Sequence, residues 1–179
     1  DGVLDEPLYY VRDADGYAAE YAMQDWFNER EFAPLEQRAL SLCTDERRVL
    51  DLGAGVGRHT LALEAAGRRG VVAIDIMPRA VDIMVERGVR HAFCVDILDA
   101  ELYDEQWRRH LLSSGTSSLP AVTRRQHGAF LAHLASAGRL FDTVLMLSDT
   151  IGFVGTIDGA RDLLRKLHFW VGVGGNVLL

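Results

Sequence analysis

Three glycines at alternate positions, directly after an apolar run, constrain the fold of this chain more than any other feature. The run Val49–Leu52 is apolar except for Asp51, and Gly53, Gly55 and Gly57 follow it. Glycine permits a tight turn and a close approach of the backbone to a ligand because it has no Cβ. A helix that starts after such a loop directs free N–H groups at a polar ligand. The segment therefore predicts a strand, a ligand-binding loop and a helix in succession.

The same order of a short apolar run and an amphipathic helix continues along the chain. Residues at about 158–169 place apolar side chains at helical spacing, and Pro78 is suited to the first turn of an earlier helix. The apolar runs predict strands at about 48–52, 70–75, 91–95, 141–147 and 175–179. Alternation of this kind indicates βαβ units. We therefore expect an α/β fold with a doubly wound parallel sheet over residues 46–179.

Two regions lie outside this alternation. Residues 1–45 mix polar and apolar side chains, and we expect an N-terminal helical cap there. In this cap Tyr17 and Tyr21 share one helix face, and a second helix covers 35–42. Residues at about 97–140 exceed a minimal strand-to-strand connection, so we expect a helical insertion into the core at that point.

The spacing of the glycines separates two kinds of nucleotide-binding loop. A dinucleotide loop follows the pattern G-x-G-x-x-G, which, counted from Gly53, requires a third glycine at the position of Arg58. The chain instead reads D-x-G-x-G-x-G, with Asp51 two residues before the first glycine. A carboxylate there suits a cofactor that carries an ammonium and a sulfonium group, because each positive charge is stabilised by a nearby anion. An NAD(P)-dependent oxidoreductase is therefore the less favoured alternative.

The glycine segment resembles motif I of the class I S-adenosylmethionine-dependent methyltransferases, and the resemblance extends over about residues 35–179. Val71–Asp75 is similar to the strand whose terminal acid binds the ribose hydroxyls of the cofactor. Phe93–Asp96 is similar to the strand whose terminal acid contacts the adenine amino group. Phe141–Leu147 resembles the strand that enters motif IV, and Gly174–Leu179 resembles the glycine-containing strand after the next helix. Five motifs occur in the order that this family requires.

This resemblance implies a Rossmann-like sheet of strand order 3-2-1-4-5 that is followed by an antiparallel strand pair. No such pair follows in this sequence, so we expect further residues beyond it. The resemblance also implies S-adenosyl-L-methionine as the cofactor, with Tyr17 and Tyr21 covering it. The cofactor-binding residues that the motifs imply are Asp51, Gly53, Ala54, Gly55, Gly57, Asp75, Ile76, Asp96, Ile97 and Leu147.

The implied reaction is transfer of the sulfonium methyl group to an O, N, C or S nucleophile of a small molecule. A hydroxyl acceptor needs a base that removes its proton, whereas a thiolate does not. Asp149 is the first candidate for this base and His59 is the second. We expect no metal ion, because Asp149 alone does not form a carboxylate cluster.

Composition limits the partners and the compartment. The net charge of −7 disfavours nucleic acid, since a polyanion meets general repulsion. The segment Ser148–Gly152 also lacks the two prolines and aromatic residue typical of methyltransferases that act on amino groups of bases. Only Cys43 and Cys94 occur, and no apolar run reaches the roughly 18 residues of a membrane span. We expect a cytoplasmic protein with a small-molecule acceptor, without nucleic acid or membrane partners, and with a homodimer as the candidate assembly.

Two further alternatives stay open. A non-catalytic binding module could keep the methyltransferase fold, because fold alone does not fix function. The presence of Asp51, Asp75 and the glycines argues instead for an occupied cofactor pocket. An aminopropyl transferase would use the same fold, but the sequence shows no convincing set of acids for a polyamine.

Overall fold

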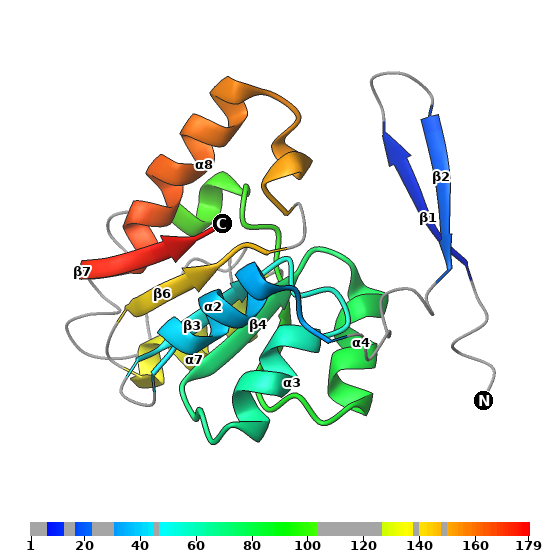
Figure 1. Ribbon diagram of the computed structural model, residues 1–179. Helices are drawn as coiled ribbons and strands as arrows, with labels where there is room; N and C mark the ends of the chain where they lie inside the picture. The colour runs from blue at the N-terminus through cyan, green and yellow to red at the C-terminus, as the bar shows by residue number, and fades with distance from the viewer. Residues whose placement is uncertain are drawn as a thin grey trace. The chain divides into compact units, whose positions relative to one another are not determined.

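Figure 1 shows the computed structural model of the chain. The structure describes residues 7–12, 17–22, 31–44, 47–103, 127–137, 140–147 and 150–179. Contacts divide the chain into two compact units, Asp1–Ala33 and Pro34–Leu179. None of the helices in the described ranges is long and apolar enough to cross a membrane.

The described part of the first unit is a pair of antiparallel strands. β1 (Pro7–Arg12) pairs with β2 (Tyr17–Ala22) along the whole length of both strands. The predicted helix through Tyr17 and Tyr21 is therefore wrong. Two residues four positions apart share a face in a strand as well as in a helix, so their spacing does not separate the two structures. An Asp-Gly pair at 15–16, which is typical of hairpin turns, is the sequence signal that favours strands.

The second unit is built on a five-stranded parallel sheet of order β5-β4-β3-β6-β7. Counted by position in the chain, this is the predicted order 3-2-1-4-5, which is confirmed. The strands are β3 (Val49–Leu52), β4 (Val71–Asp75), β5 (Ala92–Cys94), β6 (Phe141–Leu145) and β7 (Val171–Leu178).

Helices cover both faces of this sheet. They are α2 (Pro34–Leu42), α3 (Arg58–Ala65), α4 (Pro78–Glu86), α7 (Gly128–Ala137) and α8 (Ile157–Trp170), with the 3₁₀ helices η1 (Ala100–Tyr103) and η2 (Thr150–Val154). On one face Leu50 of β3 shares a core cluster with Phe130 of α7 and Trp170 of α8. On the other face Val49 packs with Ala39 of α2. Successive strand residues point to opposite faces, which explains why strands buried on both sides are apolar throughout.

Several boundaries compare directly with the prediction. The helix expected at 35–42 is present as α2, and α7 lies within the expected helical insertion. Residues 104–126 of that insertion lie outside the described residues. β7 begins at Val171 rather than at residue 175, directly after the last residue of α8. Its pairing with β6 contains a register shift, and Gly174 within it has a φ of 79°.

Candidate cofactor-binding site

The glycine loop lies where the strand order of the sheet reverses. β4 and β5 lie on one side of β3, whereas β6 and β7 lie on the other side. Doubly wound sheets bind ligands at the carboxyl ends of their strands at such a switch point. Gly53, Gly55 and Gly57 leave β3 at this end, with φ values of 68°, 55° and 82° in the region that favours glycine. The loop therefore presents its backbone at the position where a ligand is expected.

Two of the glycines are also required by close neighbours. A Cβ at Gly53 would lie 2.6 Å from Cγ2 of Thr150, which is the first residue of η2. A Cβ at Gly57 would lie 2.9 Å from Cγ2 of Val89. Gly53 is exposed, whereas Gly57 is buried. Gly57 thus permits the close packing of Val89, and Gly53 permits the close approach of the Thr150 side chain.

Asp75, the last residue of β4, is bonded to the glycine loop. Its Oδ2 accepts a hydrogen bond from the Gly55 N–H at 2.8 Å, and its Oδ1 accepts one from the Met77 N–H at 2.9 Å. Burial raises the pKa of Asp75, while these two N–H groups lower it and the nearby Asp51 raises it. Each carboxylate oxygen has a second lone pair, so the side chain retains the capacity to accept bonds from hydroxyl groups. Asp75 and the loop are therefore held together by a direct hydrogen bond.

Asp51 lies in β3 and is bonded to the helix that follows the loop. Its Oδ2 accepts a hydrogen bond from the Thr60 hydroxyl at 2.6 Å, and the side chain is 2% exposed. Burial raises the pKa of Asp51, whereas His59 and the bonds from Thr60 lower it. The structure thus places Asp51 beneath the loop, where it fixes the first turn of α3.

His59, the second candidate base, contacts α2 in this structure. Its Nε2 lies 2.7 Å from Oε1 of Glu36, and the Nη1 of Arg58 lies 2.6 Å from the same oxygen. His59 is buried, and Glu36 is partly buried. This arrangement gives His59 a positioning role between two helices. The first candidate, Asp149, lies outside the described residues.

The other predicted cofactor residues are distributed around the carboxyl ends of β4, β5 and β6. Ile76 is 59% exposed and directly follows Asp75. Asp96 is partly buried, and its Oδ1 accepts a hydrogen bond from the Leu98 N–H at 2.9 Å. Two apolar residues, Ala54 and Ile97, are buried in core clusters, and Leu147 is partly buried at the end of β6. Tyr17 and Tyr21 belong to the first unit, and only their backbone is described.

Three residues that shape this site were not predicted from the sequence. The Thr60 hydroxyl donates a hydrogen bond to Asp51, and the Glu36 carboxylate contacts both Arg58 and His59. The Thr150 side chain lies beside Gly53. The Thr150 hydroxyl also donates to the carbonyl oxygen of Leu147, two residues after the end of β6, at 2.6 Å. A threonine in the first turn of α3 has a sequence signal, because a hydroxyl there can bond a buried acid. The contacts of Glu36 and Thr150 depend on tertiary packing and have no such signal.

The sheet order, the glycine loop at the switch point and the acids near the ends of neighbouring strands define a class of protein. They form the arrangement of the class I S-adenosylmethionine-dependent methyltransferases, as the sequence motifs imply. The chain has this fold.

Solved structures agree with that class. The chain is similar over 96% of its length to an S-adenosylmethionine-dependent methyltransferase from Bacteroides fragilis, whose structure contains S-adenosyl-L-homocysteine, with 26% identity, a TM-score of 0.60 and 54% of that protein covered. A sugar N-methyltransferase from Streptoalloteichus matches 85% of the chain with 17% identity and a TM-score of 0.54, and 50% of it is covered. A TehB-like methyltransferase from Corynebacterium glutamicum matches 86% with 18% identity and a TM-score of 0.53, and 67% of it is covered.

These similarities concern the fold and only part of each solved protein. The chain spans about half the length of the first two proteins and about two thirds of the third. No family model and no curated protein matches the sequence. The similarities place the chain among proteins with the fold of the S-adenosylmethionine-dependent methyltransferases.

Proposed function

We propose that the chain binds S-adenosyl-L-methionine and transfers its methyl group to a small-molecule nucleophile. The observation that carries this proposal is the hydrogen bond from the Gly55 N–H to the carboxylate of Asp75. It joins the acid at the end of β4 to the glycine loop, so both are held in position before a ligand binds. The similar protein from Bacteroides fragilis contains S-adenosyl-L-homocysteine, the product form of this cofactor, which supports the proposal.

The residues present fit this cofactor. Gly53, Gly55 and Gly57 have positive φ values and no Cβ, so the loop turns at the carboxyl end of β3 and permits a close approach to its backbone. Asp75 accepts hydrogen bonds from the ribose hydroxyls, and the exposed Ile76 offers an apolar surface to adenine. Asp96 accepts from the adenine amino group. Asp51 stabilises the ammonium group through its charge.

When bound, the cofactor supplies an electrophilic methyl group on its sulfonium sulfur. The task of the chain is then to orient the acceptor in line with this group and to exclude water from it. Asp149 remains our candidate for removing a proton from the acceptor. His59 is placed second, because its Nε2 is bonded to Glu36. Oxygen, nitrogen, carbon and sulfur acceptors all remain within the proposal.

We infer a cytoplasmic setting and a small-molecule acceptor rather than nucleic acid. The net charge of −7 repels a polyanion, and the cysteine content matches a reducing compartment. A homodimer remains the candidate assembly.

Titration calorimetry with S-adenosyl-L-methionine, S-adenosyl-L-homocysteine and NAD tests the cofactor assignment. We expect binding of both sulfur compounds and weaker binding of NAD. Replacing Asp75 by Ala should weaken the binding of S-adenosylhomocysteine by at least about tenfold, since it removes charge-assisted acceptors. Asp75→Asn should weaken it less, because one acceptor remains. Asp82→Ala, at an exposed position on α4, is the control and should leave affinity within about twofold.

Two outcomes would contradict the proposal. One is tighter binding of NAD than of either sulfur compound. The other is wild-type affinity for S-adenosylhomocysteine in a folded Asp75→Ala variant. Binding of the cofactor without methyl transfer to any acceptor in a broad screen of small nucleophiles would favour the non-catalytic binding module.

A further inference from the structure

Basic residues precede three neighbouring strands of the sheet. Arg47 and Arg48 come directly before β3, and Arg69 is separated from β4 only by Gly70. His91 comes directly before β5. Because these strands are parallel neighbours, their first residues lie along one edge of the sheet, which we call the amino edge. The amino edge is opposite the end of the strands that carries the glycine loop.

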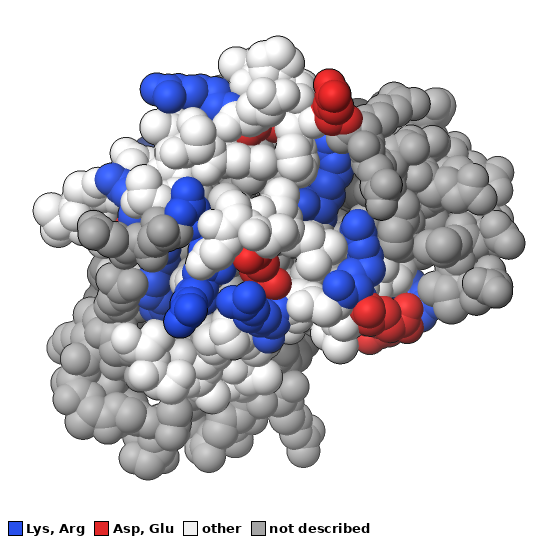
Figure 2. Space-filling view, turned by 60° about the horizontal axis from the view of Figure 1, so that its bottom comes forward, with Lys and Arg blue, Asp and Glu red and all other residues white. Residues whose placement is uncertain are grey.

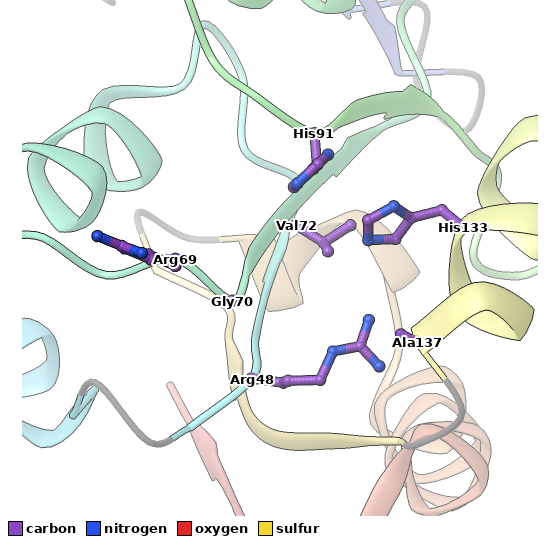
Figure 3. A pocket seen from close by; sticks show the side chains of 7 residues that line it. All are labelled: Arg48, Arg69, Gly70, Val72, His91, His133 and Ala137. Carbon is purple, nitrogen blue, oxygen red and sulfur yellow. The ribbon is translucent and has the colours of Figure 1, made fainter.

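A cavity of about 160 Å³ lies at the amino edge. Figure 3 shows the side chains of Arg48, His91 and His133 converging on it, the first two from positions directly before β3 and β5 and the third from α7, whereas Arg69 is directed away from the centre. Arg48 is buried, and Arg69 is exposed. The residues that line the cavity are Arg48, Arg69, Gly70, Val72, His91, His133 and Ala137. Every ionisable group in this lining is basic.

The fold holds these basic groups close together. The guanidinium carbon of Arg48 lies 4.9 Å from the centre of the Phe141 ring, and the Arg48 N–H donates to Oδ2 of Asp142 at 2.7 Å. The ring centres of His91 and His133 are 4.4 Å apart. Burial lowers the pKa of His133, and His91 and Arg48 lower it further. The neighbours of His133 thus disfavour a further positive charge in the cavity. A bound anion would offset this electrostatic repulsion between the basic groups.

We propose that the cavity at the amino edge binds a tetrahedral oxyanion, either inorganic phosphate or the phosphate end of a small phosphomonoester. Guanidinium and imidazole N–H groups that converge from the starts of two strands and from a helix match oxygen atoms pointing in several directions. The volume is below the roughly 300 Å³ at which pockets for drug-sized ligands begin, and it exceeds the roughly 30 Å³ share of one water. It therefore fits an ion-sized group.

The distribution of charge on the surface is consistent with a local attraction for anions. The face in Figure 2 carries more visible Lys and Arg side chains than Asp and Glu side chains among its described residues, although the chain has a net charge of −7. The proposed anion site is separate from the glycine loop and does not depend on methyl transfer. Occupancy of one site is therefore measurable without the other.

Calorimetry with inorganic phosphate on the full chain tests this site at constant ionic strength. We expect phosphate to bind the wild-type chain, and the double variant His91→Gln, His133→Gln to bind it at least about tenfold more weakly. His91 and His133 are both only partly buried, so this variant should fold. Arg165→Gln, which removes one exposed positive charge outside the cavity lining, is the matched control and should bind phosphate like wild type. Affinity for S-adenosylhomocysteine should be the same in all three proteins.

The outcomes are distinguishable. No heat of binding with phosphate at millimolar concentration in the wild-type chain overturns the proposal, and so does equal affinity in the double variant. Equal loss in Arg165→Gln shows a general charge effect and also overturns it. Titration with glycerol 3-phosphate distinguishes the two sources of the anion. Tighter binding of glycerol 3-phosphate than of inorganic phosphate identifies a phosphomonoester, and the reverse order identifies the free ion. Acetate is a planar anion, and binding of acetate as tight as that of phosphate contradicts the tetrahedral assignment. If the double variant does not fold, phosphate titration of the wild-type chain with detection of the His133 ring chemical shifts provides a second measurement. Chemical shifts that do not change on addition of phosphate contradict the site.

Discussion

Gly53 has a left-handed backbone conformation and also a close neighbour at the position of a Cβ. Gly67 has the left-handed conformation without such a neighbour, so it is a suitable control. Gly53 has a φ of 68°, and a Cβ added there would lie 2.6 Å from Cγ2 of Thr150. Gly67 has a φ of 87°, and a Cβ added there would meet no atom within 4 Å. Both Gly→Ala variants incur a backbone cost of about 1–2 kcal/mol. Gly53→Ala should lower the free energy of unfolding by about 1–3 kcal/mol more, because Thr150 must shift.

Urea denaturation of both variants measures this difference, and calorimetry with S-adenosylhomocysteine measures binding. Gly53→Ala should lose detectable binding, whereas Gly67→Ala should retain it. Thr150→Ser in the Gly53→Ala background removes the clashing methyl group and should recover part of the stability. Equal stability of the two alanine variants would show that the approach of Thr150 to the loop has no energetic consequence.

Asp51 predicts a pH dependence of stability. Burial raises its pKa above the ordinary value of 3.8, so the folded chain holds this proton more tightly than the unfolded chain. The free energy of unfolding then falls as pH rises from the ordinary pKa through the folded pKa. The amide of Asp51→Asn does not titrate in this pH range, and its oxygen can still accept the hydrogen bond from the Thr60 hydroxyl. Across a measured range from about pH 4 to about pH 7, its stability relative to wild type should therefore increase as pH rises towards the raised pKa.

Chemical denaturation at several pH values between these limits measures the effect of Asp51→Asn. Asp82→Asn, at an exposed position, controls for the loss of one negative charge. A relative stability of Asp51→Asn that declines as pH rises would mean that the carboxylate is stabilised rather than opposed by its surroundings.

At the scale of elements, Glu36 joins α2 to the first turn of α3. Its Oε1 lies 2.6 Å from Nη1 of Arg58 and 2.7 Å from Nε2 of His59. Hydrogen bonds to a charged group contribute about 1.5–3 kcal/mol, and this carboxylate is only partly buried. Glu36→Ala should therefore lower the free energy of unfolding by about 1–2 kcal/mol.

The exposed pair between Arg161 and Asp158 on α8 is the control for this prediction. Asp158→Ala should cost less than about 0.5 kcal/mol, because exposed ion pairs contribute little. Thermal denaturation of both variants makes the comparison. A loss at Asp158 as large as that at Glu36 would show that burial does not strengthen the Glu36 contacts.

The elements differ in how well their sequences predict them. β3, β4 and β6 are buried strands with strong apolar runs, and the glycine loop marks the start of α3, so these elements were predictable from the sequence pattern. The order of the sheet was implied by the family resemblance and is confirmed. The strands β1 and β2 were predicted as helix, because their tyrosine spacing fits both periods. The bond from Gly55 to Asp75 was not predicted either, since it joins residues twenty positions apart. The roles of the cofactor residues in binding stay predictions.

At the scale of the unit Pro34–Leu179, the two proposed binding sites lie at opposite ends of the strands and differ in the charge of their residues. Asp75 and Asp96 lie at the carboxyl ends, where we propose that the cofactor binds, and the amino edge carries Arg48 and His91. S-adenosylmethionine carries one more positive charge than S-adenosylhomocysteine. Raising ionic strength from about 0.01 M to about 0.15 M shortens the screening length from about 30 Å to about 8 Å. It should therefore weaken binding of the sulfonium compound more than binding of the thioether.

Calorimetry with both compounds over this range of salt gives the ratio of their dissociation constants. Asp96→Asn should reduce the difference in salt dependence, and Asp158→Asn on α8 serves as the control. An identical salt dependence for the two compounds would mean that the acids at the carboxyl ends do not act on the sulfonium charge.

The basic lining of the amino edge and the acids Asp75 and Asp96 also produce local electric fields of opposite sign at the two ends of the strands. These fields act on an approaching ion, so its encounters with the unit are not randomly distributed over the surface. Cations meet preferentially the end that holds the glycine loop, and anions meet the amino edge. An ion of either sign is therefore directed to its own end of the sheet before any contact with a side chain is formed.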